Sequence, residues 1–145
     1  MADRDEFADL LSSRSAPKSA IACPRSSTDR IDQMAFFKQF RDQLKANALI
    51  NHLEFARDRF HPNDPSLALA HLGHALKALV AIKSARAERT LTFTGWNYVV
   101  LVSSQLGMIL AIHHLADAMK DCDFIIEHAK KYKDEAQAIE FGHSH

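Results

Sequence analysis

Apolar residues recur every three or four positions through most of this chain, which is the spacing of one face of an α-helix. The first such segment starts after Thr28 or Asp29, either of which can cap a helix, and continues to about residue 60. Its apolar stripe changes face after Lys45, so we expect a kink or break between Lys45 and Asn47. The following turn contains two prolines, which end this helix.

Three further helices are predicted, over residues 67–89, over residues 96–120, and from Asp121 or Asp123 to Phe141. The segment 96–120 is apolar almost all round for four turns, which is typical of a helix at the centre of a bundle or in a membrane. This segment is interrupted by Ser103, Ser104, Gln105 and Gly107 and followed by His113, His114 and Asp117, so it is short of the roughly 20 apolar residues that a membrane span needs. We therefore expect no membrane partner and a core helix whose key side chains are almost inaccessible, namely Val99, Leu106, Ile109, Ile112 and Leu115. The conformation of residues 90–95 stays open.

The 145 residues include only four glycines and four prolines, too few turn-forming residues for a protein of many β-strands. Together with the helical spacing, this composition predicts an all-α fold, a bundle of four to five helices with a long kinked first helix and an N-terminal tail. Residues 1–27 are serine-rich and poor in apolar side chains, so we expect a tail that is flexible or ordered by a partner. Residues 28–142 are expected to form a single helical-bundle domain.

The charge balance removes one class of partner. Eighteen basic and eighteen acidic residues give zero formal charge, so no long-range field draws the chain to nucleic acid or to an anionic membrane. The two cysteines, Cys23 and Cys122, form no CxxC motif and are expected to be free thiols of a reducing compartment. The first residues are acidic where an export signal would be basic, so we expect a cytoplasmic protein.

Three phenylalanines of the first helix suggest contact with another protein. Phe36 lies off the stripe that contains Phe37 and Leu44, so the helix has more apolar surface than one core contact requires. The alternative is a long helix that wraps around its own bundle, because binding helices and core helices share the same spacing. The leading hypothesis is a small non-enzymatic interaction protein, an adaptor, assembly subunit or homo-oligomer, that binds a protein partner or itself through Phe36, Phe37 and Phe40.

Nine histidines are many for this length and suggest a metal site as the second hypothesis. If the helices form antiparallel hairpins, the turn at residues 62–65 brings His52 and Glu54 to the level of His74, and later turns bring other His and Asp residues to the same layer. A metal-binding protein or metal-dependent enzyme would then hold Zn, Fe or Mn with four residues: His71, His74, His114 and Asp117. No known ligand spacing is present. We therefore expect hydrogen-bonded histidines of which no three converge, and no cofactor.

Other chemistry has weaker support in the sequence. A third hypothesis is a subunit of a nucleic-acid assembly in which Lys83, Arg86 and Arg89 contact phosphate once oligomerisation aligns them. Nucleic-acid binding by the isolated chain is not expected, because these residues point in different directions around a helix. No phosphate-binding loop, nucleophile elbow or dinucleotide-binding motif occurs, so the sequence favours a protein that is not an enzyme.

Overall fold

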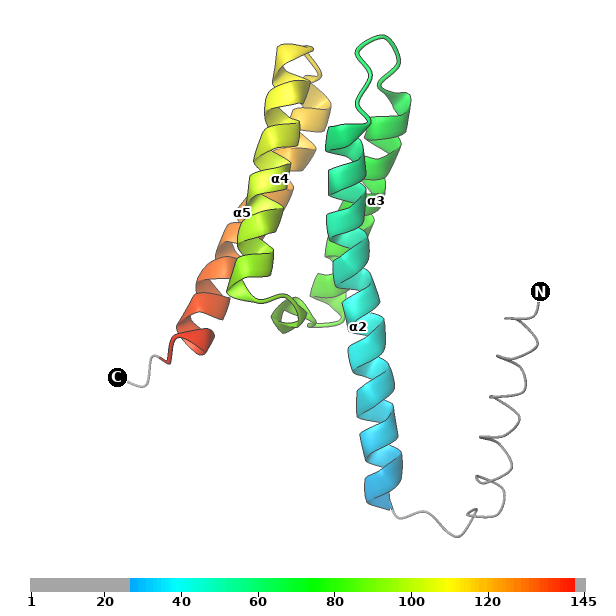
Figure 1. Ribbon diagram of the computed structural model, residues 1–145, viewed down its shortest axis with the longest axis vertical. Coiled ribbons are helices and arrows are strands. Elements are labelled where there is room, and N and C mark those ends of the chain that lie inside the picture. The colour runs from blue at the N-terminus through cyan, green and yellow to red at the C-terminus, as the bar shows by residue number, and fades with distance from the viewer. Residues whose placement is uncertain (1–26, 143–145) are drawn as a thin grey trace, which may run out of the picture. The chain divides into compact units, whose positions relative to one another are not determined.

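The computed structural model describes residues 27–142, and this part of the chain is all-α, as predicted (Figure 1). It contains four α-helices and one short 3₁₀-helix, which are α2 (Ser27–Asp58), α3 (Ser66–Ser84), η1 (Glu88–Thr90), α4 (Phe93–Ile112) and α5 (Ala116–Glu140). The described residues contain no β-strand. The predicted tail lies outside the described residues, apart from Ser27.

The internal contacts divide the chain between Phe37 and Lys38. The described part of the first unit, residues 27–37, is helical throughout and belongs to α2. The second unit is a bundle of two antiparallel helical hairpins, one formed by the remainder of α2 with α3 and the other by α4 with α5 (Figure 1). The two hairpin turns lie at the same end of this bundle, where the Phe60 and His113 rings stack with centroids 5.0 Å apart.

All four helices contribute to one core in the second unit. Its largest fully buried side chains include Leu49, Leu53, Leu72, Leu79, Ile82, Trp96, Leu106, Leu110 and Ile125. Trp96 fixes η1 against this core, because its indole Nε1–H donates a 2.9 Å hydrogen bond to the Glu88 carbonyl and its ring packs on Tyr132. Residues 90–95, whose conformation the sequence left open, comprise the last residue of η1, two non-helical residues and the first turn of α4.

Two helices end earlier than the sequence predicted. α3 stops at Ser84 instead of residue 89, and α4 stops at Ile112 instead of residue 120. In both cases the chain turns at a residue with left-handed backbone, Arg86 (φ 52°) and His114 (φ 60°). The amide after each donates to a carbonyl five residues back, Ala87 to Ile82 and Leu115 to Leu110. This is the Schellman arrangement, which usually has glycine at the left-handed position. Neither turn has a glycine there, so the sequence carried no signal for these two helix ends.

The first helix is long, as predicted, and it is helical without a break from Lys45 to Asn47. The change in its apolar stripe has another cause. The buried stripe of α2 consists of Asp42, Ala46, Leu49, Leu53 and Ala56, which repeat every three or four residues. The large apolar residues from Met34 to Phe40 do not belong to this stripe, and they are exposed.

Helix α4 is a core helix on one side only. Val99 and Leu106 are 1% exposed, as predicted, but Ile109 and Leu115 are half-buried and Ile112 is 68% exposed, so the prediction for these three was wrong. Among the described helices, α4 is the one long and apolar enough to cross a membrane, a test that the core helix of a bundle also passes. Its buried side packs against the bundle, mostly against α5.

Candidate functional site

The phenylalanines chosen from the sequence are exposed on α2. Phe36 and Phe37, in the first unit, are 64% and 56% exposed, and their rings meet edge to face with centroids 5.8 Å apart. Phe40, in the second unit, is 55% exposed. Two further large apolar side chains of the helix, Met34 and Leu44, are also more than half exposed. We call these five residues the α2 apolar group.

Helical geometry explains why these side chains remain outside the core. Phe40 and Leu44 each precede a buried residue by two positions, Asp42 and Ala46, and two positions correspond to about 200° around a helix. Phe40 and Leu44 therefore point away from the side that packs. The helix has a second apolar side in addition to the one that forms the core.

The buried side of α2 at this level contains a carboxylate that is paired within the same helix. Asp42 is 6% exposed and accepts a 2.6 Å hydrogen bond from the Lys38 ammonium, while Lys45 approaches within 3.6 Å. The hydrogen bond from Lys38 and the two positive charges lower the pKa of Asp42, although its burial opposes this effect. The carboxylate thus stays ionised although it is nearly buried.

Three histidines lie together where α2 packs against α3. The His52 ring centroid is 5.1 Å from those of His71 and His74, which are 6.0 Å from each other. The His52 and His71 Nδ1 atoms are 2.9 Å apart, so one donates and the other accepts a hydrogen bond. The predicted level of His52 and His74 is confirmed, whereas the meeting of three rings was not expected. Glu54 instead accepts a hydrogen bond from the Tyr98 hydroxyl.

The environment of His52 favours the neutral form of its ring. Burial, and then the charges that His71 and His74 would carry, lower the pKa of His52. The His71 ring also packs on Phe55, with centroids 4.0 Å apart. No group of three or more His, Cys, Asp or Glu among residues 27–142 has a geometry that could hold a metal ion.

The other residues of the metal hypothesis lie elsewhere. His114 forms the turn that ends α4, and Asp117 is exposed in the first turn of α5. The hypothesis placed the turn between the last two helices near residue 122, but the structure has it at residues 113–115. This difference shifts His114 and Asp117 to the end of the bundle. They do not form one layer with His71 and His74.

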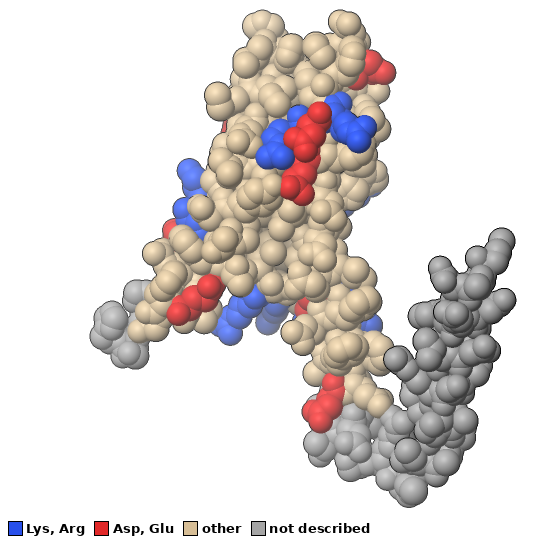
Figure 2. Space-filling view, viewed as in Figure 1, with Lys and Arg blue, Asp and Glu red and all other residues tan. Residues whose placement is uncertain are grey.

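The basic residues of the nucleic-acid hypothesis lie on three different elements. Lys83 is in the last turn of α3, Arg86 in the following turn and Arg89 in η1. The Lys83 ammonium lies 3.1 Å from His128 Nε2, so this lysine contacts α5. Figure 2 shows a face on which charges are few and mixed in sign, with no stripe of Lys and Arg.

Cys122 is fully buried in α5 and is a free thiol. Burial, with the neighbouring charges of Asp121 and Asp123, raises its pKa to about 12. The thiol therefore stays protonated and is a poor nucleophile. Cys23 lies outside the described residues.

No protein-family model, curated protein or solved structure matches this chain.

Proposed function

We propose that this chain is a small non-enzymatic, cytoplasmic interaction protein that binds a protein partner or a second copy of itself through the α2 apolar group. The observation that supports this is the exposure of five large apolar side chains within eleven residues of one helix, each more than 50% exposed. Phe36, Phe37 and Phe40 are its aromatic anchors. Aromatic side chains contribute strongly to binding energy at protein interfaces.

The energetics favour a covered state of this surface. Burying a Phe, Leu or Met side chain contributes about 1.5–3 kcal/mol, so covering even part of the α2 apolar group offsets much of the entropy lost on association. Because Phe40 and Leu44 point away from the packed side of α2, a partner can reach them without unfolding the bundle. Zero formal net charge also leaves no overall repulsion between two copies.

The test is a double variant, Phe36→Ser with Phe40→Ser, compared with the wild-type chain in light scattering. The expected result is a lower assembled mass with unchanged helical circular dichroism, because neither side chain belongs to the core. Met108→Ser with Ile112→Ser is the matched control, since these α4 side chains are 66% and 68% exposed and are not part of the group. The control variant should keep the wild-type mass.

Two results together would contradict the proposal. The wild-type chain would be a monomer at high micromolar concentration, and the Phe36→Ser, Phe40→Ser variant would retain every protein that the wild-type chain binds in its native lysate. The aromatic residues would then have no role in association.

A further inference from the structure

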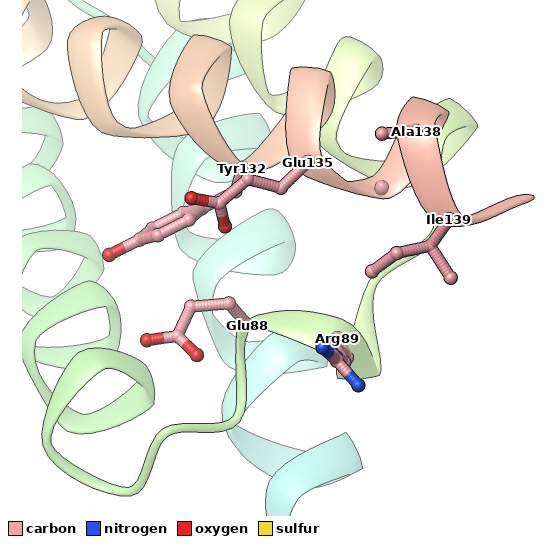
Figure 3. A pocket seen from close by; sticks show the side chains of 7 residues that line it. Glu88, Arg89, Tyr132, Glu135, Ala138 and Ile139 are labelled. Carbon is pink, nitrogen blue, oxygen red and sulfur yellow. The ribbon is translucent and has the colours of Figure 1, made fainter. Parts of the chain in front are cut away.

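A hollow of about 400 Å³ lies between η1 and the C-terminal half of α5 (Figure 3). Its lining includes Glu88 and Arg89 from η1 and Tyr132, Glu135, Ala136 and Ile139 from α5. None of these residues belongs to the α2 apolar group or to the three histidines. The hollow is thus independent of the proposed protein-binding surface.

Tyr132 gives this hollow its chemistry. The side chain is 6% exposed, and its ring packs on Trp96 with centroids 5.0 Å apart. Its hydroxyl has no hydrogen-bond partner among the described residues, yet it is not one of their fully buried unpaired atoms. The reachable end of Tyr132 is therefore the hydroxyl, which lines the hollow (Figure 3).

Two carboxylates accompany this hydroxyl. Figure 3 shows the Glu88 and Glu135 carboxylates on the same side of the hollow as the Tyr132 hydroxyl, and Arg89 on the side of Ile139. Neither Glu88 nor Glu135 forms an ion pair within residues 27–142. Burial, followed by the negative charges of Glu88 and Glu135, raises the pKa of Tyr132, so the phenol stays neutral and can accept a hydrogen bond.

We propose that this hollow is a binding site for a small aliphatic ammonium ion. The ammonium group would donate hydrogen bonds to the Glu88 and Glu135 carboxylates and to the Tyr132 oxygen, with its alkyl chain against Ala136 and Ile139. Such charge-assisted hydrogen bonds are stronger than those between neutral groups. Arg89 at the far side opposes a second positive charge, so the site selects a monoamine over a polyamine. The Tyr132 ring faces Trp96, so recognition relies on the hydroxyl and not on the π-face.

The probe is n-hexylamine at pH 7, where an alkylamine is protonated. Trp96 is the only tryptophan of the chain and contacts Tyr132, so its fluorescence reports on binding to the full-length protein. We expect saturable binding in the millimolar range, as suits a ligand of seven non-hydrogen atoms. Glu88→Gln and Glu135→Gln should each weaken it by about 10-fold, and Tyr132→Phe, which keeps the ring, by about 3-fold.

Glu127→Gln is the matched control, because Glu127 is an exposed residue of α5 that does not line the hollow. It should bind hexylamine like the wild-type chain, and hexanoate should not bind. Circular dichroism of each variant separates lost binding from lost folding. Equal binding of hexanol and hexylamine, equal affinity of folded Glu135→Gln and wild type, or no saturation below about 50 mM would each overturn the proposal.

Discussion

At the scale of single residues, two helices end at residue types that seldom adopt the left-handed backbone conformation found there. Arg86 and His114 both have positive φ, a region that costs a residue with a Cβ roughly 1–2 kcal/mol. The Schellman hydrogen bonds to the last helical carbonyls stabilise these turns. Sequence rules look for glycine at this position, so neither helix end could be predicted.

This strain makes His114→Gly a stabilising substitution. Glycine adopts φ 60° without a Cβ clash, and its greater freedom in the unfolded chain offsets only part of the gain. We expect the free energy of unfolding to rise by about 0.5–1 kcal/mol in urea denaturation. His113→Gly, at a neighbouring position with negative φ, should lower it by about the same amount. Equal destabilisation by both substitutions would show that the backbone at His114 is unstrained.

At the scale of elements, α4 shows how composition hides which side of a helix is buried. Leu106 and Ile112 are both large apolar residues of one uncharged helix, yet Leu106 is 1% and Ile112 is 68% exposed. Their positions differ by six residues, which corresponds to about 240° around the helix. Where nearly every position is apolar, periodicity cannot assign the sides. The sequence therefore predicted burial for both residues.

The two residues predict opposite outcomes for the same kind of truncation. Leu106→Ala leaves a cavity in the core and should lower the free energy of unfolding by about 2–5 kcal/mol. Ile112→Ala removes an exposed side chain and should change it by less than about 0.5 kcal/mol. Urea denaturation of both variants measures these values. A loss of 2 kcal/mol or more at Ile112 would mean that this side of α4 is covered when the protein is folded.

At the scale of the whole molecule, the sequence predicted what depends on local pattern. The helical spacing established the all-α fold, and the prolines located the turn between α2 and α3 well enough to place His52 beside His74. The turn that paired His71 with His114 was expected near residues 92 and 93, but α3 ends at Ser84 and α4 already begins at Phe93, so the layer that joined these two residues does not exist. The hollow between η1 and α5 could not be predicted, because no local spacing relates residue 88 to residues 132–139.

His52 links the stability of the whole fold to pH. The pKa of His52 is lowered in the folded chain, so below pH 6.5, the ordinary histidine value, the unfolded chain binds a proton that the folded chain does not. The contribution of His52 to stability is therefore complete above pH 6.5 and decreases as the pH falls from that value through the lowered pKa of the folded chain. The carboxylate of Asp42 acts in a separate pH range, because its lowered pKa affects stability only below about pH 4.

We expect the free energy of unfolding of the wild-type chain to decrease between pH 7 and pH 5, and we expect His52→Gln to reduce this dependence on pH. His61→Gln, at an exposed turn position, is the control that should keep it. Urea denaturation at pH 7, 6 and 5 measures the slopes, and the same slope for His52→Gln and wild type would show that protonation of His52 does not affect stability.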